Sequence, residues 1–290
     1  MGDAVDMSPM NLMRSFLFVP GNRPERFAKA AASGADVYCI DLEDAVPSSD
    51  KANARCAALD YLAARGGHAR DKPYCYLRVN PLTTAAGLED MLALRAAVAS
   101  GSVLPDVLVL PMVASVFEVQ QIVQLLDAHS ELKIMPIVET PEGVNALAQI
   151  LALSNNVVAV GFGGADYTAC TGSDGGWDAL LQARSSIASH ANVRGIHCFD
   201  SPWFVLDDES GLIEETARVS RLGFGGKMAV HPSQVAVINR MIGPSDKELC
   251  WAQDIITAYE KAGGGALSVG GMMVDEPVVQ RARRMLAFKQ

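Results

Sequence analysis

The stretch KIMPIVETPEGVNALAQILAL, residues 133–153, joins an apolar, strand-like run to a segment with apolar residues at helical spacing. The same succession repeats along the chain. Strand-like runs lie at 15–20, 36–42, 74–79, 106–113, 133–139, 156–162, 193–199 and 224–230. Nearly continuous apolar strands that alternate with helices are typical of a parallel sheet covered by helices. Eight such units in a chain of 290 residues favour a (β/α)8 TIM barrel.

The alternative fold is an open, doubly wound sheet that binds a dinucleotide. Such a sheet carries G-x-G-x-x-G after its first strand, whereas this chain has VPGNRP at 19–24. We expect residues 1–13 to be an N-terminal tail and residues 14–243 to form the barrel. Residues 244–290 are expected to form a helical extension, with a basic terminal helix over 272–290, that packs on a neighbouring subunit as a lid.

Composition and charge exclude several classes of protein. The chain is 50% hydrophobic, but its apolar runs are far shorter than the roughly 20 residues of a membrane span. With 24 basic and 33 acidic residues it carries a charge of -9 and has no basic tract suited to nucleic acid. No secretory signal is recognisable, and the six cysteines form no CxxC pair, so we expect a reduced, cytoplasmic protein.

Ionisable residues gather after the predicted strands, where the chemistry of a (β/α)8 enzyme takes place. They are Arg23, Asp41, Glu43, Asp44, Arg78, Glu139 and Asp166. A single acid there often caps a helix or pairs with a surface cation. Two acids on adjacent strands, Glu139 and Asp166, are costly to place together without a cation between them. Because Mg2+ prefers oxygen ligands, the pair predicts a magnesium site.

Cationic side chains at two places are candidates for binding an anionic ligand. Arg78 has a permanent planar charge suited to a carboxylate or an enolate, although it is also placed to be a structural partner of Glu43 or Asp44. Arg23 and Lys29 lie beside a helix predicted to start at Pro24, and together they form a patch able to hold phosphates. The alternative for the patch is a solvated basic helix face.

Other chemistries lack the residues they need. Lys227 is the one lysine placed in a strand for a Schiff base, and His197 and His231 are too few for a histidine-rich zinc site. No G-x-S-x-G elbow is present.

Six motifs in order carry a family resemblance: LFVPGNRPERF, CIDLEDAV, LRVN, PIVETPEGV, GFGGADY and KMAVHPSQV. From about residue 14 to the C-terminus the chain resembles the citrate lyase beta subunit-like enzymes of the HpcH/HpaI aldolase/citrate lyase superfamily, which includes malyl-CoA and citramalyl-CoA lyases. The resemblance implies a TIM barrel assembled as a homotrimer or homohexamer. It also implies Mg2+-dependent cleavage or formation of a carbon-carbon bond next to a thioester.

The resemblance also assigns roles to residues. Glu139 and Asp166 would hold the metal, and Arg78 would bind the reacting thioester oxygen. The coenzyme A part of the substrate would contact Phe18, Arg23, Lys29, Ala165, Val230 and His231. Asp275, in GMMVDEP, would reach a neighbouring subunit's site as a catalytic residue, and an N-cap position at the start of a helix is compatible with that role. Asp41, Glu43 and Asp44 would support the site.

The sequence therefore predicts a Mg2+-dependent lyase that splits a short 3-hydroxyacyl-CoA, such as malyl-CoA or citramalyl-CoA, into acetyl-CoA and a 2-oxoacid. Its alternatives are a citryl-carrier-protein lyase, which needs an acyl carrier protein partner, and a pyruvate or oxaloacetate aldolase that does not use CoA. A catalytically inactive CoA-binding protein is a third. The segment IHCFDSPWFVLDDES, residues 196–210, fits no single subfamily and is expected to shape acyl selectivity.

Overall fold

A computed structural model describes residues 13–67, 73–126, 132–153 and 155–288. The chain divides into two compact units, one spanning Met13–Met241 and the other beginning at Ile242. The first unit contains the predicted strands, and the second contains the C-terminal extension. No described helix is long and apolar enough to cross a membrane.

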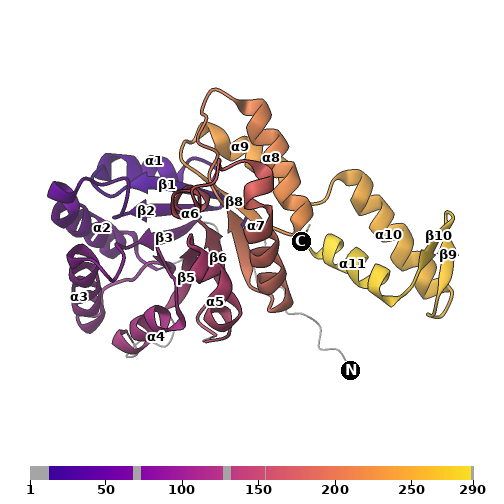
Figure 1. Cartoon of the computed structure of the whole chain (residues 1–290), viewed down its shortest axis with the longest axis horizontal. Coiled ribbons are helices and arrows are strands. Elements are labelled where there is room, and N and C mark those ends of the chain that lie inside the picture. Colours follow the sequence, from indigo (N-terminus) through magenta and orange to yellow (C-terminus); the bar gives the residue numbers. More distant parts are fainter. Residues whose placement is uncertain (1–12, 68–72, 127–131, 154, 289–290) are drawn as a thin grey trace. The chain divides into compact units, whose positions relative to one another are not determined.

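The first unit is a closed barrel of eight parallel strands, which confirms the predicted (β/α)8 fold (Figure 1). The strands are β1 (Ser15–Pro20), β2 (Val37–Asp41), β3 (Tyr74–Arg78), β4 (Val107–Leu110), β5 (Lys133–Val138), β6 (Ala159–Phe162), β7 (His197–Asp200) and β8 (Gly226–Ala229). The pairing of Ser15 with Lys227 and of Leu17 with Ala229 closes β1 onto β8. All eight strands run in one direction, so their C-terminal ends form one mouth.

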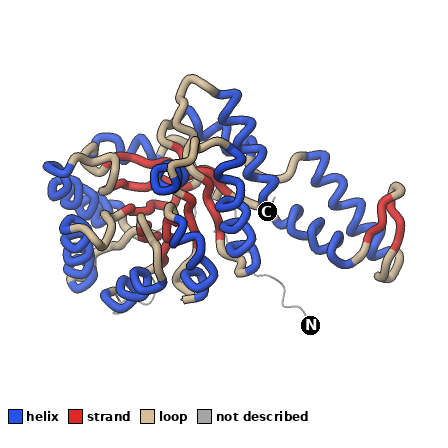
Figure 2. Tube along the Cα trace, in the orientation of Figure 1, coloured by secondary structure: helices blue, strands red, loops and turns tan. Residues whose placement is uncertain are grey.

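Helices surround the strands (Figure 2). They are α1 (Phe27–Ala31), α2 (Lys51–Arg65), α3 (Ala85–Ala99), α4 (Val116–Leu125), α5 (Pro141–Ala152), α6 (Gly164–Thr171), α7 (Trp177–Val193), α8 (Glu209–Leu222) and α9 (Ser233–Met241), with short 3-10 turns at Pro24–Arg26 and Ser48–Asp50. The stretch 133–153 becomes β5 and α5, because Thr140 accepts a hydrogen bond from Gly143 N at 3.1 Å and Pro141 begins the helix.

Three sequence expectations need correction. The helix predicted from Pro24 begins as a 3-10 turn, and α1 has only five residues, so no long helix dipole points at Arg23. Val193, expected in a strand, is the last residue of α7, and β7 begins at His197. The fourth strand stops at Leu110, because Met112 takes a left-handed backbone conformation with a φ of 55°.

Aromatic side chains pack the interior of the barrel. The ring of Phe16 meets Tyr76 and Phe199 edge to face, with centroids 5.4 and 5.2 Å apart. Phe18, two residues further along β1, lies nearer the C-terminal mouth and stacks under the guanidinium of Arg78 at 4.7 Å. The aromatic layer thus fills the barrel below the charged residues.

The second unit consists of α10 (Asp246–Lys261), a hairpin of β9 (Leu267–Val269) and β10 (Met272–Val274), and α11 (Glu276–Ala287). The prediction that one helix covers 272–290 was wrong, since 272–274 is a strand. Gly270 and Gly271 both have positive φ, at 54° and 82°, as a two-residue hairpin turn requires. This unit has its own small core of Ala252, Ile255, Val274, Val279 and Ala282.

Candidate active site

Glu139 follows β5 at the mouth of the barrel and is 3% exposed. Its Oε1 accepts a short hydrogen bond from the backbone N–H of Met112, in the loop after β4. Met112 is the one non-glycine residue with a positive φ in the described part of the chain. A bulky residue in this region costs free energy, and such conformations cluster at functional sites. Here the left-handed turn directs an N–H group at the carboxylate.

Asp166 lies in the first turn of α6, after the glycine pair that ends β6. A Cβ atom on Gly163 would overlap Oε2 of Glu139, so the backbone of this turn runs directly against the Glu139 carboxylate. The negative charge of Asp166 contributes to the raised pKa of Glu139, so the structure brings the two predicted acids together. Within the described residues, the Asp166 carboxylate has neither a hydrogen bond nor an ion pair with another side chain.

Burial raises the pKa of Glu139 from 4.5 to about 8. The Met112 N–H and Arg78 act against this shift, whereas the charges of Asp166 and Glu43 add to it. A buried carboxyl beside a second carboxyl with no cation between them is stabilised when a cation binds. The two acids supply hard oxygen ligands, and no group of three or more His, Cys, Asp or Glu suited to a metal exists among the described residues. Two carboxylates fit Mg2+, which keeps waters and takes substrate oxygens, better than zinc.

Arg78, at the end of β3, is held in a fixed plane by acids. Its Nε and Nη2 donate to the two oxygens of Asp41 at 2.8 and 2.7 Å, and Nη1 lies 2.6 Å from Oε2 of Glu43. Asp44, the third predicted supporting acid, is mostly exposed and 3.8 Å away. Asp41, which also accepts the backbone N–H groups of Glu43 and Ala45, is therefore the main partner of Arg78.

The pairing leaves Arg78 charged and able to bind a ligand. Burial lowers its pKa, but Asp41 and Glu43 outweigh that effect and hold the pKa above its usual value. An arginine has five N–H groups; the hydrogen bonds to Asp41 use two of them, and Nη1 forms the ion pair with Glu43. Burial also raises the pKa of Glu43 to about 7 against the opposing charge of Arg78. The arrangement thus presents a preoriented cation at the mouth.

Lys227 cannot serve as a free amine nucleophile. Its Nζ is fully buried and donates to Asp200, Glu215 and the carbonyl oxygen of Ser201, each at 2.7 Å. Arg184 completes a group of two cations and two anions through contacts with Asp200 at 2.8 Å and Glu215 at 3.0 Å. Although burial raises the pKa of Asp200, the two cations hold it below its usual value. These contacts remove the one lysine that the sequence placed in a strand for a Schiff base.

The two histidines considered above differ in environment. His197 is buried, contacts the carbonyl oxygen of Met13 through Nε2 at 2.7 Å, and has a pKa lowered to about 4 by burial. It is part of the core. His231 is exposed in the loop after β8, where its Nδ1 lies 2.8 Å from the hydroxyl of Ser233.

The residues expected to contact CoA lie in β1 or after β1, β6 and β8, whose C-terminal ends share the mouth. Phe18 is half-buried beneath Arg78, while Arg23, Lys29, Ala165, Val230 and His231 are exposed. Asp275 belongs to the second unit and occupies the N-cap position of α11, but its side chain makes no capping hydrogen bond. Its carboxylate is therefore not used in holding the helix.

The loop after β7, expected to shape acyl selectivity, carries exposed apolar side chains. Phe204, Val205 and Leu206 are each more than half exposed. The loop is anchored where Gln234 Nε2 donates to the carbonyl oxygen of Trp203 at 2.6 Å, and Asp208 caps α8. Its backbone is thus fixed while its apolar side chains face solvent.

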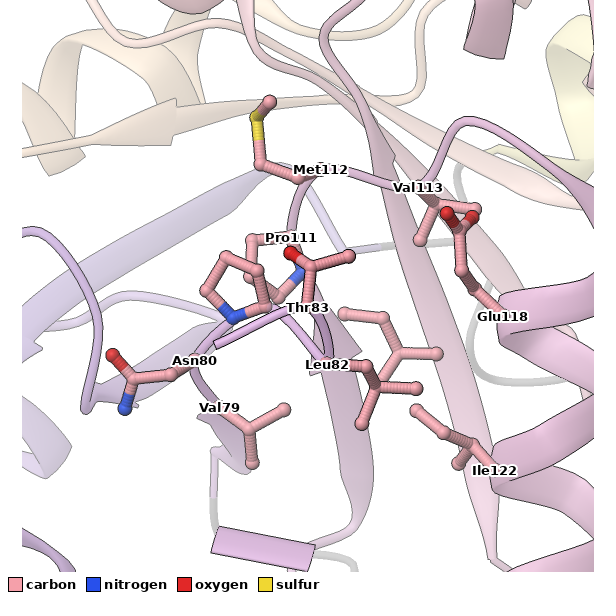
Figure 3. Close-up of a pocket in the computed structure, with 11 residues that line it drawn as sticks. Val79, Asn80, Leu82, Thr83, Pro111, Met112, Val113, Glu118 and Ile122 are labelled. Atoms are coloured by element: carbon pink, nitrogen blue, oxygen red, sulfur yellow. The ribbon is translucent and has the colours of Figure 1, made fainter. Parts of the chain in front are cut away.

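A small cavity lies beside the site, between the loops after β3 and β4. Figure 3 shows Asn80 and Glu118 on opposite sides of it, with Pro111 and Thr83 between them. Its volume of about 20 Å³ holds roughly one water molecule. The cavity is therefore too small to hold a substrate.

The closed barrel with ionisable side chains at its C-terminal mouth defines a (β/α)8 barrel enzyme. Residues 14–232 match the family HpcH/HpaI aldolase/citrate lyase. The chain belongs to this family, which confirms the resemblance found in the sequence, and it is a carbon-carbon lyase by class.

Named relatives cover nearly the whole chain. The citrate lyase subunit beta of Leuconostoc mesenteroides subsp. cremoris is 33% identical over 97% of this chain and 94% of its own. The L-malyl-CoA/beta-methylmalyl-CoA lyase of Rhodobacter capsulatus is 31% identical over 95% of this chain and 94% of its own. The crystal structure of CitE from Mycobacterium tuberculosis in complex with magnesium, acetoacetate and coenzyme A matches with a TM-score of 0.79 and 30% identity, covering 96% of this chain and 98% of that one.

Proposed function

We propose that this protein is a Mg2+-dependent lyase that cleaves or forms a short 3-hydroxyacyl-CoA of the malyl-CoA or citramalyl-CoA type. Cleavage would yield acetyl-CoA and a 2-oxoacid. The observation that carries the proposal is the buried Glu139, whose pKa is raised by burial and by the nearby charge of Asp166 and lowered by that of the cation Arg78. The relative from Rhodobacter capsulatus, named as a malyl-CoA lyase, and the CitE complex with magnesium and coenzyme A support it.

In this proposal each residue has one task. Glu139 and Asp166 would hold Mg2+, which when bound acts as a Lewis acid and lowers the pKa of a hydroxyl group. Loss of the substrate's hydroxyl proton to solvent would start cleavage of the bond between the α and β carbons of the acyl chain. The hydroxyl oxygen becomes the carbonyl oxygen of the 2-oxoacid, and the electron pair of the broken bond passes to the thioester enolate. Arg78, fixed by Asp41, stabilises the negative charge that develops on the thioester oxygen. Asp275 of a neighbouring subunit then transfers a proton to the enolate carbon.

The last task requires more than one copy of the chain. We propose a homotrimer or homohexamer in the cytoplasm, in which residues 244–290 pack on a neighbouring subunit. The Asp275 carboxylate makes no capping hydrogen bond to α11, and this supports the role because the side chain is not needed to hold the helix. Sedimentation of the purified protein tests the assembly.

The proposed reaction is tested by incubating the purified protein with malyl-CoA, citramalyl-CoA and citryl-CoA, with and without EDTA. We expect a 2-oxoacid and a C2 thioester from one of the first two, and EDTA should stop their formation. A further incubation with a citryl group on an acyl carrier protein tests the alternative: reaction with that substrate only would favour a citryl-carrier-protein lyase, in line with the citrate lyase subunit beta of Leuconostoc. No EDTA-sensitive cleavage of any of these substrates would overturn the proposal.

Replacing both Arg23 and Lys29 with Ala tests the use of coenzyme A. Both side chains are exposed after β1, so their loss should weaken binding without disturbing the fold. We expect KM for the acyl-CoA to rise about tenfold with kcat nearly unchanged, as for binding equal in the ground and transition states. Arg221→Ala, an exposed arginine at the end of α8, is the control. An unchanged KM in the double variant would favour an aldolase that does not use CoA.

The raised pKa of Glu139 predicts pH-dependent metal affinity. The metal needs the carboxylate, whereas the metal-free protein keeps Glu139 protonated below about pH 8. We expect the Mg2+ dissociation constant to fall about tenfold per pH unit between about pH 6 and 8 and to level off above that. Calorimetry in buffers of different ionisation enthalpy measures both this constant and the released proton.

The metal-free protein should show the opposite trend in stability. The carboxyl titrates at 4.5 when unfolded and at about 8 when folded, so between these values the folded state binds more protons. Its contribution to the free energy of unfolding therefore falls as pH rises through this window. A Mg2+ affinity that stays constant from about pH 6 to 8 would contradict the assigned role of Glu139.

A further inference from the structure

One hydroxyl group closes the turn that carries Asp166. Ser201 directly follows β7, is 4% exposed, and donates through Oγ to the carbonyl oxygen of Phe162 at 2.9 Å. Oγ of Ser201 also accepts a hydrogen bond from the backbone N–H of Gly164 at 2.9 Å. Ser201 thus bridges the last residue of β6 and the first residue of α6. The path of the chain through Gly163 is set between these two bonds.

The turn is held tightly from both sides. A Cβ atom on Gly164 would lie 2.6 Å from Oγ of Ser201, and one on Gly163 would overlap the Glu139 carboxylate. Ser201 and Glu139 therefore contact the turn from the neighbouring strands β7 and β5. Any displacement of the turn away from Ser201 changes its contact with Glu139 and moves Asp166, two residues further along α6.

Ser201 is itself fixed by a buried cation. Its carbonyl oxygen accepts from Lys227 Nζ at 2.7 Å, and Lys227 is also held by Asp200 and Glu215. The ion group that excludes Lys227 from amine chemistry therefore anchors the residue behind the turn. With three acceptors at 2.7 Å, the buried ammonium group of Lys227 has all its N–H groups used and is held in one position.

We propose that Ser201 is a positioning residue that sets the distance between the Asp166 and Glu139 carboxylates. The inference rests on the proposed Mg2+ site and adds a residue outside it. Hydrogen bonds behind metal ligands fix their orientation, and their loss commonly weakens metal binding ten- to a hundredfold. Ser201 reaches the two carboxylates through the backbone of the turn between them.

The test is a Mg2+ titration of the full chain by calorimetry, together with melting curves with and without Mg2+. Ser201→Ala removes both hydrogen bonds at little change in volume. Ser15→Ala is the matched control, because Ser15 is also a buried serine whose hydroxyl accepts a backbone N–H, from Asp36 at 3.2 Å. Ser15 begins β1 and pairs with Lys227 in the sheet, but among the described residues its hydroxyl makes no hydrogen bond with the turn that carries Asp166. Gly164→Ala is a second variant, because its Cβ atom would lie 2.6 Å from Oγ of Ser201 and would disturb the same two hydrogen bonds.

We expect Ser201→Ala and Gly164→Ala to raise the Mg2+ dissociation constant about ten- to a hundredfold, with Ser15→Ala like the wild type. Metal-free melting temperatures of Ser201→Ala and Ser15→Ala should be similar, while only the former loses most of its Mg2+-induced rise. Should Ser201→Ala fail to fold, the Mg2+ dissociation constant of Gly164→Ala tests the proposal instead. Wild-type affinity in either folded variant overturns the role of Ser201. Absence of Mg2+ binding by the wild type would instead overturn the proposed function.

Discussion

Asp166→Asn is expected to abolish measurable Mg2+ binding and to lower kcat/KM by about a thousandfold or more. Asparagine keeps the shape of the side chain but removes one of the two charges that hold the cation. Among the described residues the Asp166 carboxylate makes no hydrogen bond or ion pair, and its charge helps to raise the pKa of Glu139, so the metal-free variant should melt at the wild-type temperature or above. Loss of activity without loss of stability is the result expected if Asp166 binds the metal and does not hold the fold.

Calorimetric Mg2+ titration and steady-state kinetics measure the two effects. Asp178→Asn is the control, since Asp178 is an exposed acid in the first turn of the next helix, α7. The pKa of Glu139 should also fall in Asp166→Asn, because the charge of Asp166 helps to raise it. A variant that binds Mg2+ as the wild type does would remove Asp166 from the proposed site.

Arg78→Lys should lower kcat by about a hundred- to a thousandfold, the range for loss of one preorganised donor to a developing oxyanion. Lysine keeps the charge, but its single ammonium group cannot bind both oxygens of Asp41 and still face a substrate in a fixed plane. The melting temperature should fall as well, because Asp41 is buried and loses its paired donor. Steady-state kinetics and thermal melting separate the two consequences.

Arg65→Lys is the matched control for the cost in stability. Arg65 pairs with Asp106 at 2.9 Å, and its side chain is 6% exposed compared with 11% for Arg78. That pair lies near the start of β4, at the opposite end of the barrel from the mouth. We expect Arg65→Lys to lower the melting temperature and to leave kcat intact. If Arg78→Lys also kept its kcat, Arg78 would be only the structural partner of Asp41 and Glu43.

The barrel was predictable because its pattern is local. An apolar run, a capping threonine and a proline at the first helical position mark β5 and α5 within a few neighbouring residues. The hairpin of the second unit was not predicted, because its three-residue strands are too short to show an alternation of apolar and polar residues. Its one signal was the pair Gly270 and Gly271, which the turn requires.

The site was predictable as far as residue type and strand position determine it. Arg78 ends β3, Glu139 and Asp166 follow β5 and β6, and parallel strands bring such residues to one mouth. Their supports were not predictable. Nothing in the sequence indicates that Met112 adopts a left-handed conformation, and the contacts of Ser201 join residues 37 and 39 positions apart. Such contacts depend on the closed tertiary structure.

The close approach of Gly163 to Glu139 limits how this enzyme can be re-engineered. A library that randomises position 163 would consist almost entirely of inactive clones, since every side chain larger than hydrogen collides with the carboxylate. Diversity is better placed at Phe204, Val205 and Leu206, whose exposed side chains project from an anchored loop and can be exchanged at little cost to folding. Tolerance to mutation is therefore unequal around this mouth, low at Gly163 after β6 and high at residues 204–206 in the loop after β7.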